Sequence, residues 1–231
     1  MTQIKVIGFD LDDTLWDNTP VMINAEKTLA EWLLQQVPDF RYDLMGMRDL
    51  RMEVVEQDPG LKARLTEMRW QIIHLAMDRS GYPESRCREV ADAAMAVFLE
   101  ARNDITFFEG TLSALTQLAE KYILGSLSNG NSSIFRLGLE AYFSFAFSAE
   151  DVGAAKPDPA LFQRALEHTE VAPAEMIYVG DDPVLDIDAA NHAGLRTIWL
   201  NRKNKSAGET AADVIISDIA EVVEAVEELA S

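Results

Sequence analysis

The sequence contains little cysteine and no long hydrophobic run. Cys87 is the only cysteine among the 231 residues, so no disulfide can form within the chain, and a reducing compartment is expected. No apolar run approaches the roughly 20 residues that a membrane-spanning helix needs. The first residues lead directly into a predicted strand, without the basic and apolar segments of a secretory signal. We therefore expect a cytoplasmic protein with no membrane partner.

Basic residues are also scarce. The chain has 20 Lys and Arg against 39 Asp and Glu, which gives a formal net charge of -19 at pH 7. A surface with this charge repels nucleic acids and anionic membranes, so we expect neither as a partner. It also repels an anionic substrate. Any phosphate site in this chain therefore needs a bound metal ion and a well-placed Lys or Arg.

A short apolar segment near the start of the chain ends in carboxylates. Residues 4–9 predict a strand that is buried on both faces, as in a parallel sheet. Asp10 and Asp12 follow, and in an extended chain they point to the same side. Their charges repel each other unless a cation lies between them, and oxygen ligands suit Mg²⁺. An acidic turn without a function is the alternative.

The rest of the chain is first purely helical and then alternates between strands and helices. In the first block we expect helices over 21–36, 43–57, about 61–80 and 83–101. In the second block we expect strands at 123–128, 145–148, 176–179, 197–200 and 214–216. The helices expected between and after these strands cover 110–121, 132–139, 157–168, 183–193 and 219–229. The polar loop 201–210 is expected to be mobile.

This order predicts an α/β fold with an insertion. Repeated strand–helix units form a doubly wound parallel sheet with helices on both faces. We expect residues 1–15 and 105–231 to form this Rossmann-like core, and residues 16–104 to form an inserted all-helical cap.

Several polar residues follow predicted strands or begin predicted helices in the second block. They are Ser128, Asn129, Lys156, Asp181 and Asp186. Each alone is typical of a turn, an exposed lysine or a helix N-cap. In open α/β sheets, however, ligands bind beyond the carboxyl ends of the strands. Because all of these residues fall at such ends, we expect them to form one site with Asp10 and Asp12.

The same residues resemble the motifs of the haloacid dehalogenase-like hydrolase superfamily over nearly the whole chain. The segment 10–14, Asp-Leu-Asp-Asp-Thr, matches the first motif, DxDxT. Ser128 matches the second motif and Lys156 the third, while Gly180-Asp181 with Asp186 matches the fourth, GDxxxxD. A helical insertion between the first two motifs is similar to the C1-type cap of this superfamily.

The resemblance implies a phosphomonoester hydrolase that uses Mg²⁺. Asp10 would attack phosphorus and form an aspartyl-phosphate, and Asp12 would serve as general acid and then general base. Asp10, the main-chain carbonyl of Asp12 and Asp181 would hold the metal ion.

The remaining motif residues would support this chemistry. Ser128, the N–H of Asn129 and Lys156 would bind the phosphate oxygens. Asp186 would orient Lys156 or a metal-bound water.

Other activities of the same superfamily remain as alternatives. A 2-haloacid dehalogenase needs no metal and lacks the second Asp of the first motif, so the presence of Asp12 favours a phosphatase. A phosphomutase would use the same machinery. A non-catalytic phosphate-binding module would be expected to have lost a motif residue, and none is missing.

The expected substrate is a small phosphorylated metabolite. Residues 13–18, 66–70 and 129–131 resemble bacterial phosphatases of flavin mononucleotide and of 5-amino-6-(5-phosphoribitylamino)uracil, which implies a role in riboflavin biosynthesis. Candidates for contacts to the substrate's head group are Trp16, Arg48, Arg51, Arg64, Arg69 and Trp70, each of which could equally be structural or solvated. A monomer or a homodimer is expected.

Overall fold

The computed structural model describes residues 3–40 and 44–231, and the chain divides into two compact units. We call Met1–Asn18 with Ile105–Ser231 the sheet unit, and Thr19–Asp104 the helical unit. Trp16, which we expected in the helical insertion, is fully buried in the sheet unit, edge-on to Phe107 with ring centroids 6.1 Å apart. That the helical unit acts as a cap stays a prediction.

The sheet unit contains the predicted doubly wound parallel sheet. Its strands are β1 (Val6–Phe9), β2 (Ile123–Ser128), β3 (Phe145–Ser148), β4 (Met176–Gly180), β5 (Arg196–Leu200) and β6 (Val214–Ile216). The strand order is β3-β2-β1-β4-β5-β6, and every neighbouring pair is parallel. The chain winds outward in both directions from β1, so the topological switch point lies beside this central strand.

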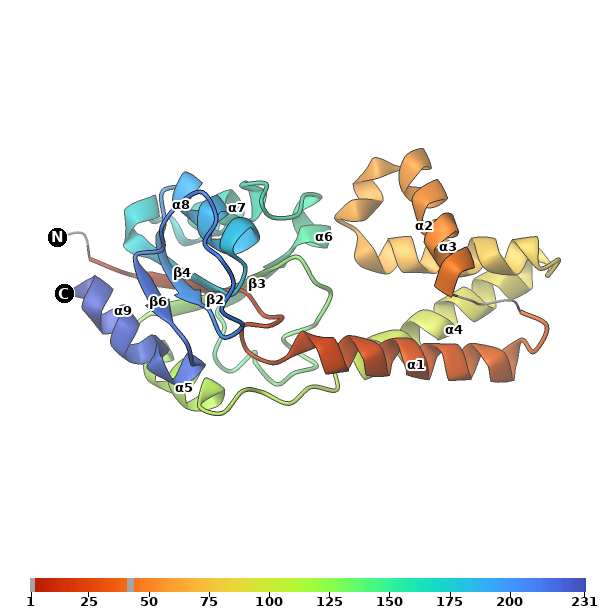
Figure 1. Cartoon of the computed structure of the whole chain (residues 1–231), viewed down its shortest axis with the longest axis horizontal. Helices are drawn as coiled ribbons and strands as arrows, with labels where there is room; N and C mark the ends of the chain where they lie inside the picture. The colour runs from red at the N-terminus through yellow and green to blue at the C-terminus, as the bar shows by residue number, and fades with distance from the viewer. Residues whose placement is uncertain (1–2, 41–43) are drawn as a thin grey trace. The chain divides into compact units, whose positions relative to one another are not determined.

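Helices cover both faces of the sheet (Figure 1). They are α5 (Thr111–Ala119), α6 (Ala149–Val152), α7 (Ala160–Thr169), α8 (Ala189–His192) and α9 (Val222–Ala230). Figure 1 shows α5 and α9 on one side and α6, α7 and α8 on the other. Under α7, the ring of Phe162 packs edge-on against Tyr178 of β4, with centroids 4.9 Å apart. The strands β1, β2, β4 and β5 are largely buried on both faces, which explains their nearly continuous apolar sequences.

Two helices predicted in the sheet unit were wrong in whole or in part. Residues 134–138 form turns and no helix, and Gly138 has a φ of 68°, a left-handed conformation that does not continue a helix. The buried Ile134 and Leu139 account for the apolar spacing that suggested a helix. The helix expected from residue 157 begins at Ala160, whose N–H donates to the side chain of Asp158 at 2.9 Å.

The helix predicted over 183–193 has an unusual first part. Residues Pro183–Asp188 are wound as a π-helix, and α8 follows. The N–H groups of Asp186 and Ile187 both donate to the carbonyl of Asp182, at 3.1 and 3.2 Å. Wide turns of this kind occur often at functional sites, and here the turn carries Asp186.

The helical unit contains four α-helices and a short 3₁₀ turn within its described residues. They are α1 (Asn18–Gln36), α2 (Leu44–Gln57), the turn Pro59–Lys62, α3 (Leu65–Arg79) and α4 (Glu84–Arg102). Their apolar faces share one core, which includes Leu29, Ile73, Phe98 and the thiol of Cys87. The helix expected over 61–80 begins only at Leu65, because the preceding residues form the 3₁₀ turn. The expected start at Asp43 lies outside the described residues.

Candidate active site

The carboxyl ends of β1, β2 and β4 open onto a cavity of about 200 Å³ in the sheet unit. All of the side chains predicted for the site line it: Asp10, Asp12, Ser128, Asn129, Lys156, Asp181 and Asp186. The cavity lies at the switch point of the sheet, which is where the topology predicts a ligand. Its lining contains six aspartates but only two lysines, so it is strongly acidic.

Lys156 connects the acidic groups at the bottom of this cavity. Four oxygens lie within hydrogen-bond distance of its buried Nζ: Asp10 Oδ1 at 2.8 Å, Asp186 Oδ1 at 2.7 Å, the hydroxyl of Tyr178 at 2.7 Å and the carbonyl of Leu127 at 3.0 Å, which its three N–H groups share. Burial lowers the pKa of Lys156, but the charges of Asp10 and Asp186 outweigh burial and hold it well above its usual value. The ammonium group therefore stays charged.

Three carboxylates form a group that suits a divalent cation. Asp10, Asp181 and Asp186 each offer an oxygen within 4.8 Å of the others. Burial raises the pKa of Asp10 well above its usual value, although Lys156 opposes this. Burial also raises the pKa of Asp181 to about 6, with Lys205 opposing it. Crowded, buried carboxylates ionise more easily when a cation lies among them, and an all-oxygen set fits Mg²⁺.

Asp186 is fixed in this group from several directions. One of its oxygens accepts from Lys156 and the other accepts from the N–H of Asp182 at 2.9 Å. Its side chain also lies against the end of β4, where a Cβ added to Gly180 would lie 2.5 Å from the Cβ and Cγ of Asp186. The glycine of the Gly180-Asp181 pair is therefore needed to make room for Asp186.

The side chain of Asn129 holds the backbone of Lys156. Its Nδ2 donates to the carbonyl of Lys156 at 2.9 Å, and the N–H of Lys156 donates to its Oδ1 at 2.7 Å. Neighbouring Ser128 is buried, and its Oγ accepts from the N–H of Gly130 at 3.0 Å. From the sequence we expected only the main-chain N–H of Asn129 to matter, so this role of its side chain was missed.

Two further residues of the site, Lys205 and Tyr178, were not predicted from the sequence. The hydroxyl of Tyr178 contacts Lys156, as described above. Lys205 Nζ donates to Asp181 Oδ2 at 2.6 Å and lies 3.6 Å from an oxygen of Asp182. Its backbone is joined to the side chain of Asn201 by hydrogen bonds of 2.7 and 3.0 Å. A lysine in a polar loop and a tyrosine within an apolar strand carry no local signal of such contacts.

The loop 201–210 is attached to the sheet unit at more than one point. Lys203 Nζ donates to Asp13 Oδ1 at 2.9 Å. Near the other end of the loop, the carboxylate of Asp188 accepts from the N–H groups of Glu209 and Thr210, each at 2.8 Å. The expected mobility of this loop stays a prediction, but the structure gives it several polar anchors.

The six candidates for substrate contacts have different environments. Trp16 is buried in the sheet unit. Trp70 donates to Asp92 at 2.7 Å and stacks on His74, and Arg64 pairs with Asp58 and Glu67. The other three, Arg48, Arg51 and Arg69, line one pocket in the helical unit.

Comparisons with known proteins find relatives that match most of the chain. Relatives include the 5-amino-6-(5-phospho-D-ribitylamino)uracil phosphatase YigB of Escherichia coli (strain K12), which is 32% identical over 90% of this chain and 88% of its own. The phosphoserine phosphatase of Thermus thermophilus is 28% identical over 95% of this chain and 98% of its own. Among the described residues, no helix is long and apolar enough to cross a membrane.

A solved structure is similar over the full fold. The 2-haloacid dehalogenase from Pseudomonas syringae pv. Tomato DC3000 matches with a TM-score of 0.95 and 36% identity, covering 98% of this chain and 99% of that one. The family model of the haloacid dehalogenase-like hydrolases matches residues 4–194. The chain therefore belongs to the haloacid dehalogenase-like hydrolase family.

Proposed function

We propose that this protein is a Mg²⁺-dependent phosphomonoester hydrolase that acts on a small phosphorylated metabolite. The observation that carries the proposal is the cavity at the switch point, in which Lys156 contacts Asp10 beside the carboxylates of Asp181 and Asp186. A nucleophilic carboxylate, a buried cation and a set of metal ligands are the components that phosphoryl transfer from an ester requires.

In the first step, a carboxylate oxygen of Asp10 attacks phosphorus. The bond between phosphorus and the ester oxygen breaks, and the carboxyl group of Asp12 gives its proton to the leaving alkoxide. The products are an aspartyl-phosphate on Asp10 and the free alcohol. The hydrogen bond from Lys156 to Oδ1 of Asp10 fixes the orientation of this carboxylate.

In the second step, water attacks the phosphorus of the aspartyl-phosphate. The carboxylate of Asp12 takes a proton from this water, the bond between phosphorus and Asp10 breaks, and inorganic phosphate leaves. Asp12 ends in its protonated form, so the cycle is closed without any further reactant.

The phosphate oxygens are held by Ser128, the N–H of Asn129 and Lys156, all of which line the cavity. Each loss of such a group is expected to lower the rate by roughly 10²–10³-fold. Asp10, Asp181 and the main-chain carbonyl of Asp12 are the proposed metal ligands. A bound Mg²⁺ supplies positive charge that offsets the repulsion between a carboxylate and an anionic phosphate.

The name of the Pseudomonas syringae relative makes dehalogenation a second candidate. Halide displacement by Asp10 would leave Asp12 and the carboxylate of Asp181 without a task. Both line the cavity here, and this favours phosphate ester hydrolysis. A phosphomutase would use the same groups, since it differs only in the acceptor of the phosphoryl group.

The relatives differ in their substrates, so the substrate is proposed at two levels. A small phosphomonoester is the general proposal. The name of YigB and the sequence resemblance favour flavin mononucleotide or 5-amino-6-(5-phosphoribitylamino)uracil as the specific one, with a place in riboflavin biosynthesis. Equal kcat/KM values across a panel of phosphomonoesters would contradict the specific proposal and leave the general one intact.

The direct test is hydrolysis of p-nitrophenyl phosphate with Mg²⁺ and with EDTA, beside chloride release from 2-chloropropionate. We expect Mg²⁺-dependent release of p-nitrophenol, no chloride release, and loss of p-nitrophenol release in Asp10→Asn. Chloride release without phosphatase activity would identify a dehalogenase. If neither reaction occurs in the wild type, a phosphate-binding module is the better interpretation.

A further inference from the structure

The helical unit contains a pocket of about 290 Å³ whose lining combines methionines with arginines. Helix α2 contributes Met47, Arg48 and Arg51, and helix α3 contributes Met68, Arg69 and Ile72. On each helix, residues four apart lie on the same face, so the two helices present similar mixed surfaces to the pocket. Its volume is at the lower end of the roughly 300–1,000 Å³ of small-molecule sites, which suits one end of a metabolite.

Two of these arginines have no carboxylate partner within residues 3–40 and 44–231. The guanidinium groups of Arg48 and Arg51 form no ion pair there, and both side chains are exposed. Arg79 and Arg88, on the same unit, are paired with Glu53 and Glu84.

The third arginine is fixed in place. Arg69 pairs with Glu26 at 2.8 Å and lies 3.8 Å above the ring of Phe98. Its charge is therefore shared with Glu26, while those of Arg48 and Arg51 are available to a ligand. Guanidinium groups bind carboxylate and phosphate with two parallel hydrogen bonds, and methionine adapts to apolar groups of varied shape.

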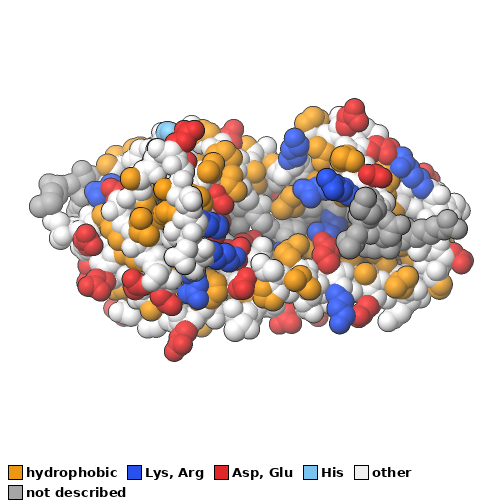
Figure 2. Space-filling model, viewed as in Figure 1, with side chains coloured by type: hydrophobic (Ala, Val, Ile, Leu, Met, Phe, Trp, Pro, Cys, Tyr) orange, Lys and Arg blue, Asp and Glu red, His pale blue; other side chains and the backbone are white. Residues whose placement is uncertain are grey.

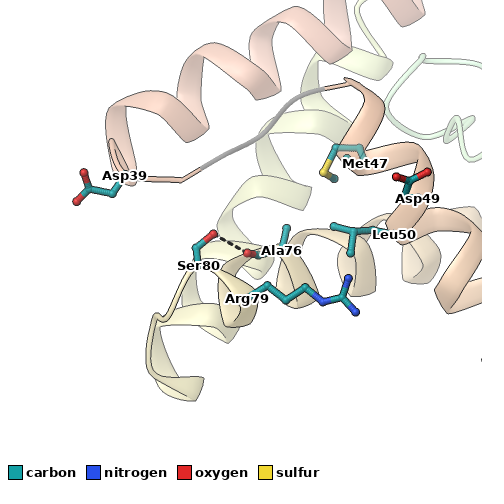
Figure 3. A pocket seen from close by; sticks show the side chains of 8 residues that line it. Asp39, Met47, Asp49, Leu50, Ala76, Arg79 and Ser80 are labelled. Carbon is teal, nitrogen blue, oxygen red and sulfur yellow. Dashed lines mark hydrogen bonds between the residues drawn. The ribbon is translucent and has the colours of Figure 1, made fainter.

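A larger cavity in the same unit has different chemistry. Its volume is about 590 Å³, and Figure 3 shows Asp39, Asp49 and Arg79 in its lining. Both oxygens of Glu53 accept from Arg79, each at 2.6 Å. Two aspartates and an arginine that is already paired do not favour an anion. Only the smaller pocket, lined by Arg48, Arg51 and Arg69, therefore has more positive than negative side chains. Figure 2 shows Lys and Arg side chains grouped with hydrophobic ones on the helical unit.

From these contacts we infer that the pocket between α2 and α3 binds an organic anion, with Arg48 and Arg51 on its acidic group and Met47, Met68 and Ile72 against its apolar part. The anion is a separate metabolite that binds within the helical unit, and this inference does not depend on the proposed function.

Binding is tested without catalysis, with 8-anilinonaphthalene-1-sulfonate as the fluorescent probe. The double variant Arg48→Gln/Arg51→Gln is expected to bind it at least about tenfold more weakly than the wild type, because hydrogen bonds to a charged group are lost. Arg88→Gln removes an exposed arginine of the same unit outside the pocket and is expected to bind as the wild type does. The neutral analogue N-phenyl-1-naphthylamine should not distinguish the proteins.

The inference is overturned if the double variant binds the probe as tightly as the wild type does. Far-ultraviolet circular dichroism and thermal unfolding check that both variants fold like the wild type. The probe experiment uses no phosphomonoester, so its outcome is independent of the proposed function.

Discussion

Two hydrogen bonds join the side-chain amide of Asn129 to the main chain of Lys156, in both directions, at 2.9 and 2.7 Å. They connect the segment after β2 with the segment that carries the buried lysine, 27 residues later in the sequence. These two hydrogen bonds help to set the position of the Lys156 ammonium relative to Asp10. They do so through the main chain, because they touch neither the ammonium group nor the Asp10 carboxylate.

Asn129→Ala is therefore expected to impair catalysis without unfolding the protein. Loss of both hydrogen bonds frees the backbone at Lys156, and supporting residues of this kind typically contribute roughly 10–100-fold to activity. The expected result is a lower kcat for p-nitrophenyl phosphate by that factor. Gln163→Ala, which removes an exposed amide on α7, is the control. Equal kcat values for the two variants would show that the amide pair does not position Lys156.

Gly180→Ala is expected to displace Asp186. The new methyl group would lie 2.5 Å from the side chain of Asp186, so the protein should lose about 1–3 kcal/mol of unfolding free energy and bind Mg²⁺ more weakly. Gly81→Ala is a control for Mg²⁺ binding only: its φ of 85° strains an alanine, but no neighbouring atom lies within 4 Å, so the variant should lose stability without a change in Mg²⁺ binding. Thermal unfolding with and without Mg²⁺ separates the two effects. A Gly180→Ala variant with unchanged Mg²⁺ stabilisation would contradict the packing argument.

Mg²⁺ binding is expected to weaken below about pH 6. Burial raises the pKa of Asp181 from 3.8 to about 6, and a protonated carboxyl group does not bind the ion. The apparent affinity should fall by up to about tenfold per pH unit below that value and level off above it. Calorimetric titrations from pH 5 to pH 8 measure this, and an affinity that does not change over that range would exclude a role for Asp181.

The same group affects the stability of the metal-free protein with a definite sign. Since its pKa is higher in the folded state, the folded protein binds more protons than the unfolded chain between pH values of about 4 and 6. The contribution of Asp181 to the free energy of unfolding therefore decreases as pH rises through this window. Asp181→Asn should remove this part of the pH dependence, as measured by urea unfolding in EDTA.

Lys205→Met is expected to raise the pKa of Asp181 further. Lys205 donates to Asp181 at 2.6 Å and lowers its pKa, so loss of the ammonium group leaves the effect of burial unopposed. The midpoint of the pH dependence of Mg²⁺ binding should move above 6. Lys203→Met is the control, because Lys203 lies in the same loop and pairs with Asp13 instead. A shift of equal size in both variants would indicate a general effect of net charge.

The sequence by itself determined the sheet and the positions of the motif residues. Buried parallel strands are short apolar runs, and each such run in the second half of the chain proved to be a strand of the sheet. The carboxyl ends of these strands lie at one edge, so the order of strands and helices was enough to predict that residues such as Asp10, Ser128 and Asp181 share one cavity.

Only the tertiary structure decided which distant side chains meet. Apolar spacing over 132–139 suggested a helix, but Ile134 and Leu139 are buried within a series of turns. Lys205 contacts Asp181, although its local sequence is that of a polar loop. Arg48 and Arg51 line one pocket, although their local sequence is that of a solvated helix. Periodicity shows which face of an element is apolar, but the partner of that face depends on long-range packing, which no local pattern contains.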